Sequence, residues 1–250
     1  MSITEGMVIF IVGIAAGFAN TVAGGGSLLS LPVLIFMDLP SSVANATNRV
    51  AIIMQNIFAV SGFKSKGVST FPYSLYLGLS ALVGAIIGAR IAVDISSDLF
   101  NQILSIVMLL VVIMTIFNPF RKTQQIEEIM TFNRKALALV VFFFIGIYGG
   151  FIQAGVGFLM IAALTSINGF SLVKTNSAKV FVALIYTSAA IIVFIIEDQI
   201  NWEYGIVLAM GNSLGGWIGS RWSVNKGDKW IKRFLVVTVV ALAVKLWFFN

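Results

Sequence analysis

Apolar runs long enough to cross a lipid bilayer recur along this chain, and glycines interrupt two of them. The first interrupted stretch covers about residues 7–37 and contains Gly24-Gly25-Gly26; the second covers about 135–167 and contains Gly155-Val156-Gly157. In hydrocarbon, irregular backbone survives only where it is buried in protein or lines a cavity. Paired glycine-interrupted segments in the two halves of a chain are typical of a transporter's substrate site.

The composition supports a membrane protein and excludes several kinds of site. Of 250 residues, 59% are hydrophobic and 10% are charged, which is unlike a soluble domain. The chain has no Cys and no His. Disulfides, thiolate or imidazole metal sites and Ser-His catalysis are therefore excluded. We expect no metal site, no cofactor, no catalytic residue and no enzymatic activity. The net charge of +6 is explained by basic cytoplasmic loops, so no nucleic-acid partner is expected.

An internal repeat divides the chain into halves. With an offset of about 130 residues, Arg49-Val50 falls on Lys179-Val180, and Gly84-x-x-x-Gly88-x-Arg90 falls on Gly215-x-x-x-Gly219-x-Arg221. The Gly-x-x-x-Gly spacing predicts close helix crossings. Residues 1–117 are predicted to form a first transmembrane repeat, 118–134 a cytoplasmic linker, and 135–250 a second repeat.

Each half holds one long apolar stretch and three ordinary spans. A straight helix of about 30 residues would be about 45 Å long, against a hydrocarbon core of about 30 Å. Each long stretch is therefore either one tilted, broken span or two short arms folded at the glycines. The ordinary spans are expected near 42–63, 71–93 and 99–117, and near 172–196, 202–224 and 230–249.

The basic residues favour the folded arms. With one span per stretch, the sixteen Lys and Arg divide almost evenly between the two sides of the membrane. With folded arms, all but Arg49, Arg90 and Lys245 lie on one side, as the positive-inside rule requires. Each half then crosses the membrane an odd number of times, so the two halves have opposite orientations. We therefore predict an all-α, polytopic membrane protein of ten helical segments, built from two inverted repeats, each with a Gly-broken helical hairpin plus three transmembrane helices.

The glycine breaks are the first candidate binding elements. New helices are expected to begin near Ser27 or Leu28 and near Phe158, with Ser27 as an N-cap. Their unpaired N–H groups and positive dipole ends suit an anion. Polar neighbours support this interpretation, namely Asn20, Thr21 and Gln153. The alternative is that these glycines only allow tight helix packing.

A second cluster opens the span after each hairpin. Asn48 and Arg49 lie there in the first half, and Asn176 and Lys179 in the second. A cation inside the membrane is a functional candidate by default. The alternative is that these long side chains snorkel to the headgroups. Arg90 and Arg221, by contrast, are expected to anchor helix ends at the interface.

These residues resemble a known family. The run Gly-x-x-Asn-Thr-x-x-Gly-Gly-Gly-Ser-Leu-Leu-x-x-Pro, from Gly17 to Pro32, resembles the opening motif of the sulfite exporter TauE/SafE family. The Ala-Thr-Asn segment at residues 46–48 and the repeated Gly-x-x-x-Gly-x-Arg are similar too. The resemblance covers the whole chain and implies movement of small organic or inorganic sulfur anions, such as sulfite or sulfonates.

The resulting hypothesis is a secondary transporter or facilitator of a small, sulfur-containing anion. It would lie in the inner membrane of a bacterium as a multi-pass protein with extracytoplasmic termini. An anion channel and a non-transporting membrane assembly protein are the alternatives, and the sequence leaves a homo-oligomer open. The predicted substrate-binding residues are Asn20, Thr21, Gly24, Gly25, Gly26, Ser27, Asn48, Arg49, Gln153, Gly155, Gly157, Asn176 and Lys179.

Overall fold

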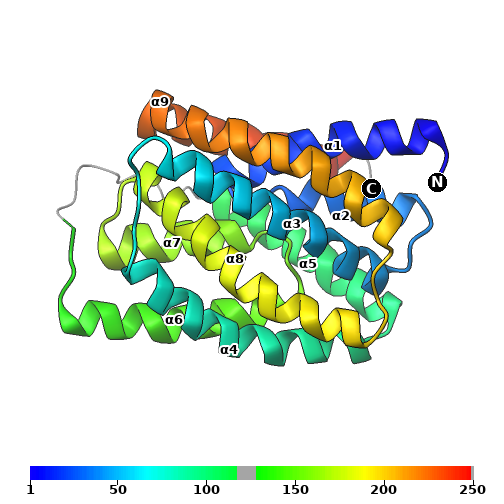
Figure 1. The fold of residues 1–250 in the computed structure, drawn as a ribbon, viewed down its shortest axis with the longest axis horizontal. Helices are drawn as coiled ribbons and strands as arrows, with labels where there is room; N and C mark the ends of the chain where they lie inside the picture. Colours follow the sequence, from blue (N-terminus) through cyan, green and yellow to red (C-terminus); the bar gives the residue numbers. More distant parts are fainter. Residues whose placement is uncertain (117–127, 249–250) are drawn as a thin grey trace.

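The chain forms a bundle of helices that run roughly along one common axis (Figure 1). A computed structural model describes residues 1–116 and 128–248, and all regular elements in these ranges are α-helices. In chain order they are α1 (Ile3–Val22), α2 (Ser27–Phe36), α3 (Ser41–Lys64), α4 (Tyr73–Asp94), α5 (Ser97–Ile116), α6 (Phe132–Phe151), α7 (Val156–Asn168), α8 (Leu172–Ile196) and α9 (Trp202–Phe248).

Both long apolar stretches fold into two arms, as predicted. The first breaks between α1 and α2 and the second between α6 and α7. Gly24 and Gly155 have φ of 90° and 75°, a left-handed conformation that only glycine adopts without strain. The helix expected near Phe158 begins slightly earlier, at Val156.

The expected role of Ser27 as an N-cap is wrong. Gly26 caps α2 and makes no side-chain capping bond. Ser27 is instead the first helical residue, and its hydroxyl accepts a hydrogen bond from Asn48 Nδ2 at 3.2 Å. The Ser27 hydroxyl oxygen, which a local N-cap would use to accept from a backbone N–H, instead accepts from Asn48 on α3.

The last element consists of two helical segments joined at Gly227. This residue has φ 72° and ψ −177° inside α9, so the helical ladder is interrupted there. The break falls between the two spans predicted near 202–224 and 230–249. The described helices therefore comprise the ten segments expected from the sequence.

Apolar helices of membrane-spanning length are present in both halves. Among the described residues, α1, α4, α6 and α8 are long and apolar enough to cross a bilayer, and α2 and α7 are shorter apolar helices. Helix α3 has 24 residues but is more polar, because Asn45, Asn48, Arg49, Gln55 and Asn56 lie on it. The protein is thus an all-α, multi-pass membrane protein with one unusually polar helix, α3.

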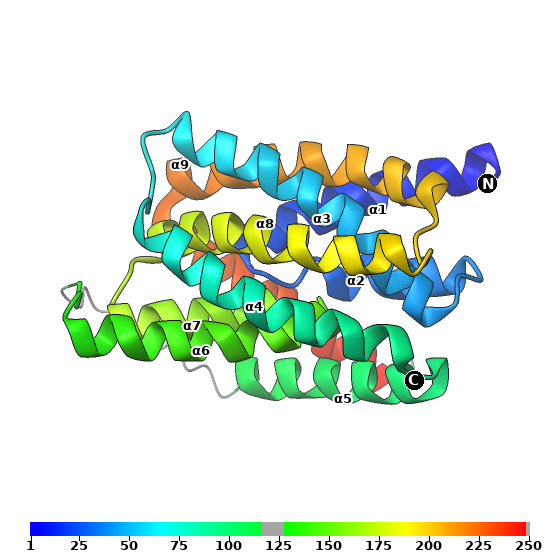
Figure 2. The same ribbon diagram turned by 60° about the horizontal axis from the view of Figure 1, so that its bottom comes forward.

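Helices of the two halves pack in matched pairs. Helix α1 packs on α9 as α6 packs on α4, and α3 packs on α9 as α8 packs on α4. In Figures 1 and 2, α1 and α3 run in the direction opposite to α6 and α8. The predicted close crossings are present: a Cβ added at Gly84 would collide with the Phe143 carbonyl of α6, and one at Gly215 with the Ile14 carbonyl of α1.

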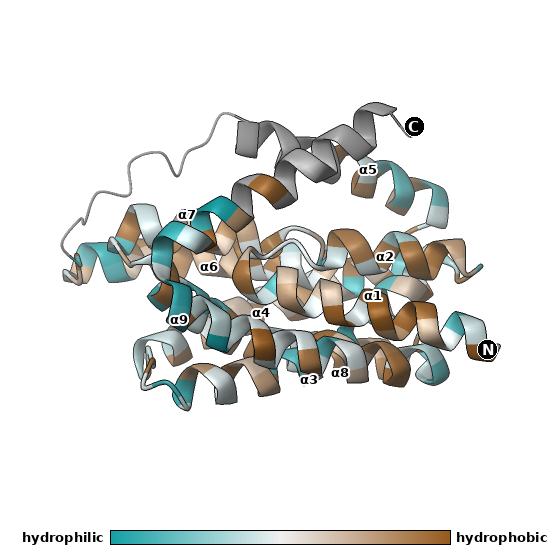
Figure 3. Cartoon of the chain, turned by 90° about the horizontal axis from the view of Figure 1, so that it is seen from above, coloured by the Kyte–Doolittle hydropathy of each residue, from teal (hydrophilic) through white to brown (hydrophobic). Residues whose placement is uncertain are grey.

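The two ends of the bundle differ in charge. We call them the basic end, where α3 ends and α8 begins, and the acidic end, where α1 begins and α8 ends. Figure 3 shows hydrophilic residues gathered at the helix ends and apolar ones between them. At the basic end, Arg221 donates a hydrogen bond to Ser65. At the acidic end, the Met1 amino group forms an ion pair with Glu203. This polarity is the one that the charge count predicted.

Candidate functional site

The two glycine breaks meet inside the bundle. A Cβ added at Gly24 would collide with the backbone of Gly157, and one at Gly157 with the backbone of Gly24. Beside them, a Cβ at Gly25 would lie 2.8 Å from the ring of Phe158. The tips are therefore in backbone contact, which only residues without side chains allow. This contact supports the packing role of these glycines and places both helix starts, α2 and α7, in one region.

Arg49 of the first half binds the break of the second half. Its Nη1 donates to the Gly149 carbonyl at 2.9 Å and to Gln153 Oε1 at 3.3 Å. Its Nη2 donates to the Gly150 carbonyl at 2.6 Å. The guanidinium also lies 4.8 Å from the ring centroid of Phe194. Arg49 thus satisfies carbonyls that the end of α6 leaves without helical partners.

Lys179 of the second half makes the corresponding contacts with the break of the first half. Its Nζ donates to the carbonyls of Asn20 and Thr21, at 2.9 and 3.0 Å, where α1 ends. It also donates to Asn176 Oδ1 at 2.8 Å, and Asn176 Nδ2 in turn donates to the Val22 carbonyl at 2.8 Å. Each half therefore holds the broken helix of the other half with one cation.

Neither cation snorkels to a membrane face. Arg49 is fully buried and Lys179 is 3% exposed, so the snorkelling alternative is wrong, and neither belongs to the basic or the acidic end. The ion pairs found in the described part of the chain are Met1 with Glu203, Arg90 with Glu197 and Lys174 with Glu128. Among the described residues, Arg49 and Lys179 are thus two buried basic side chains that carbonyls and amides hold without a carboxylate.

A small polar cavity lies between the breaks and α8. Its volume of about 10 Å³ has room for roughly one water molecule. Four of the predicted residues line it: Asn20, Gln153, Gly157 and Lys179. Its lining also includes Asn56, Met160, Val180, Ala183 and Tyr186. We call this space the central cavity.

Tyr186 and Asn56 are cavity residues that were not among the predicted ones. Tyr186 is fully buried, and its hydroxyl accepts a hydrogen bond from Gln153 Nε2 at 2.8 Å. Asn56 is 1% exposed, and its Nδ2 has no hydrogen-bond partner within the described residues. The repeat offset places Tyr186 opposite Asn56 in the two halves. That correspondence is the sequence signal that could have identified the pair.

The other predicted residues do not line the cavity and instead make contacts within and between the helices and breaks of the two halves. Asn48 accepts a hydrogen bond from Ser30 Oγ at 2.7 Å and binds Ser27, which fastens α2 to α3. Thr21 Oγ1 accepts from Gln55 Nε2 at 3.4 Å. Gly26 lies against the Ala16 carbonyl, and Gly155 turns the chain into α7. Gly24, Gly25 and Asn176 make the tip and helix-end contacts described above.

Arg90 and Arg221 lie apart from this site. Arg90 pairs with Glu197 at 3.6 Å, and its side chain is 63% exposed. Arg221 stacks on Trp217, 4.5 Å from the ring centroid, and contacts Ser65. Both positions fit the expected anchoring of helix ends at the interface.

Known proteins are similar to this chain over nearly its whole length. The family model described as Sulfite exporter TauE/SafE matches residues 9–246. A probable membrane transporter protein, ORF9, of a Sinorhizobium species is 26% identical over 95% of this chain and 90% of its own length. One from Haemophilus influenzae is 24% identical over 96% and 93%. The probable membrane transporter YfcA of Escherichia coli K12 is 27% identical over 96% and 88%.

The comparison with solved structures gave no match, so the family match carries the identification. The family and these relatives are described as transporters and not as enzymes. Their coverage includes both glycine breaks and both buried cations. The chain belongs to the sulfite exporter TauE/SafE family of membrane transporters.

Proposed function

We propose that this transporter is a secondary transporter or facilitator that moves a small anion, sulfur-containing and of the size of sulfite or a short sulfonate, across the bacterial inner membrane. The observation that carries the proposal is the pair of buried cations, Arg49 and Lys179, without a carboxylate partner in the described residues beside a polar cavity. Burying an uncompensated charge is costly. An anion that enters this region would offset that cost.

The hydrogen bonds of the two cations leave the helix starts free to attract an anion. Arg49 and Lys179 are bound to the carbonyl ends of α6 and α1, which carry partial negative charge. The first backbone bonds of α2 and α7 are donated by Leu28 and Phe158. The N–H groups just before them, including that of Gly157 in the cavity wall, are typical anion ligands.

The sulfur-containing part of the proposal rests on the family. The family is described as a sulfite exporter, and the relatives are described only as probable transporters. Sulfite and sulfonates are compact oxyanions that accept several hydrogen bonds at once, which suits amide, ammonium and backbone N–H donors. Asn56 Nδ2, which has no partner among the described residues, supplies such a donor in the cavity wall, and the Lys179 side chain lies in the same wall.

Transport requires the central cavity to open. A volume of about 10 Å³ is too small for a sulfur oxyanion. The proposed movement is alternating access, in which one part of the repeat pair moves against the other; the repeats, residues 1–117 and 135–250, are inverted and are joined by a cytoplasmic linker at 118–134. The matched helix pairs and the reciprocal contacts of Arg49 and Lys179 support this relation. Because each matched pair joins a helix of one half to a helix of the other, each moving part would contain helices of both halves, and their movement would open the site to each side in turn.

The transport mechanism can be measured in proteoliposomes. We expect flux of sulfite or a short sulfonate to saturate with concentration and to show counterflow when unlabelled anion is placed inside. A flux that rises linearly and lacks counterflow would indicate an anion channel instead. No flux of sulfite, sulfate, thiosulfate or sulfonates, in vesicles that carry correctly folded protein, would contradict the proposed function.

The topology gives a separate prediction. Because the acidic end holds the start of α1 and the loop after α2, cysteines introduced at Ser2 and Asp38 should both react with an impermeant thiol reagent from outside the cell. A cysteine at Lys66, at the basic end, should react only when the cytoplasmic face is accessible. The chain has no native cysteine to interfere. Labelling of Ser2→Cys and Asp38→Cys from opposite faces would rule out the inverted repeat.

A further inference from the structure

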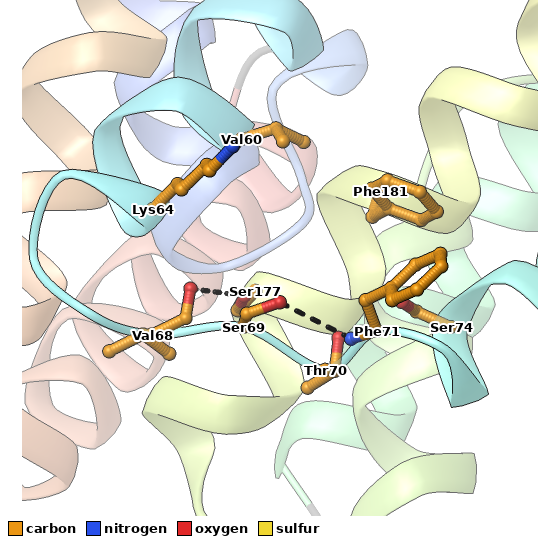
Figure 4. Close-up of a pocket in the computed structure, with 9 residues that line it drawn as sticks. All are labelled: Val60, Lys64, Val68, Ser69, Thr70, Phe71, Ser74, Ser177 and Phe181. Atoms are coloured by element: carbon orange, nitrogen blue, oxygen red, sulfur yellow. Dashed lines mark hydrogen bonds between the residues drawn. The ribbon is translucent and has the colours of Figure 1, made fainter.

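A second and larger pocket opens at the basic end, separate from the central cavity. Its volume is about 350 Å³, and it lies between the end of α3, the following loop and the starts of α4 and α8 (Figure 4). Its polar lining consists of Lys64, Ser69, Thr70, Ser74 and Ser177. The rings of Phe71 and Phe181 form an apolar wall. The pocket thus offers one ammonium and several hydroxyls beside aromatic surface.

One hydroxyl in this pocket is buried without a partner. Ser74 is 1% exposed, and its Oγ has no hydrogen-bond partner among the described residues. A buried hydroxyl is normally hydrogen-bonded, and leaving one unpaired costs about 1–3 kcal/mol. Since Ser74 lines the pocket, a ligand with acceptor oxygens is a fitting partner. Lys64, which is exposed and also lines the pocket, supplies a positive charge there.

The pocket and the central cavity are lined by one stripe of α3. Asn56, Val60 and Lys64 follow each other at four-residue spacing, so they share a helix face. Asn56 lines the central cavity, whereas Val60 and Lys64 line the pocket. Between the two spaces, Val60 packs in an apolar cluster with Val180 and Phe63. This cluster separates the pocket from the cavity by a thin layer of side chains.

We propose that this pocket is a vestibule that binds the oxyanion group of the substrate at the basic end, before or after it passes the Val60–Val180 layer. The inference rests on the proposed function and extends it by a second binding site. The mixed lining suits a tetrahedral oxyanion with a short apolar substituent, such as a small alkyl sulfonate. The phosphate of a lipid headgroup presents the same chemistry, so the test includes an arm for lipid.

A charged thiol reagent probes the vestibule without any need for transport. Ser69 is exposed in the pocket wall, and Ser69→Cys would be the only cysteine in the chain. We expect the ratio of its rate with a negatively charged methanethiosulfonate to its rate with the positively charged counterpart to exceed the same ratio for a free thiol in solution. Lys64→Gln should lower that rate ratio about 3- to 10-fold, because one positive charge in the pocket lining is removed. The matched control is Lys66→Gln, an exposed lysine outside the lining; an equal effect of both substitutions would overturn the proposal.

Protection by a small anion tests the role of Ser74. Methanesulfonate should slow the labelling of Ser69→Cys, and Ser74→Ala should raise the protecting concentration at least about threefold, because a hydrogen bond to the anion is lost. Protection that is unchanged in Ser74→Ala would contradict the site. Slowing by vesicles rich in phosphatidylglycerol, without protection by methanesulfonate, would assign the pocket to a lipid headgroup and overturn the proposal. If wild-type flux saturates while these labelling tests fail, only the vestibule is wrong.

Discussion

Gly157→Ala is expected to abolish transport while the protein still inserts into the membrane. A Cβ at this position would collide with the backbone of Gly24 at the tip of the other hairpin. The tips would have to separate, which displaces the start of α7 from the cavity that Gly157 lines. Misplacing a positioning group by about 1 Å can cost roughly 100-fold in rate. We expect a loss of at least that order in flux.

Gly24→Ala should have the same effect for two reasons. Its Cβ would collide with Gly157, and its φ of 90° is unfavourable for a residue with a side chain. The matched control is Gly205→Ala, because a Cβ there would make ordinary contacts with Val50, the nearest at 3.4 Å. Flux is to be compared at equal amounts of protein in the vesicles. Near wild-type flux of Gly157→Ala would show that the tip contact is not needed for transport.

The hairpins and the helical segments could be predicted from the sequence because membranes impose few solutions. Backbone must be helical in hydrocarbon, and Lys and Arg stay on the cytoplasmic side. These two rules, with the glycines at 24–26 and 155–157, were enough to predict the two hairpins and ten helical segments. The repeated Gly-x-x-x-Gly likewise predicted the crossings of α4 with α6 and of α9 with α1, since small residues let backbones approach.

The contacts of the site could not be predicted in the same way. Arg49 and Gly149 are 100 residues apart in the chain, and Lys179 and Asn20 are 159 residues apart. The repeat indicated that Arg49 and Lys179 correspond, but it could not show that each binds the helix end of the other half. Ser27 was misassigned because a local capping rule ignored Asn48 on another helix. Tyr186 was not among the predicted site residues, because its hydrogen-bond partner, Gln153, lies outside its own helix and only the structure shows the contact.

The buried cations have a structural role as well as the proposed binding role. Lys179 already donates three hydrogen bonds, two of them to carbonyls of α1. A substitution that removes the donors would leave these groups unpaired and destabilise the protein. Glutamine has a fairly long side chain whose amide N–H groups can still donate hydrogen bonds, but it carries no charge. Gln is therefore the substitution that separates the electrostatic role from the structural one.

The most direct test of this account is the affinity of the purified protein for its anion, at fixed salt, in Lys179→Gln and Arg49→Gln. Each charge-assisted contact contributes about 1.5–3 kcal/mol, so we expect affinity to fall about 10- to 150-fold. Lys179→Gln should cause the larger loss, because Lys179 lines the central cavity. Thermal unfolding of each variant would show that it remains folded.

Arg90→Gln is the control for this measurement, because Arg90 is exposed and pairs with Glu197 away from the cavity. The account predicts nearly unchanged affinity in Arg90→Gln and a clear loss in both buried-cation variants. Unchanged affinity in folded Lys179→Gln and Arg49→Gln, or a greater loss in Arg90→Gln than in either, would contradict the claim that the two buried cations hold the transported anion.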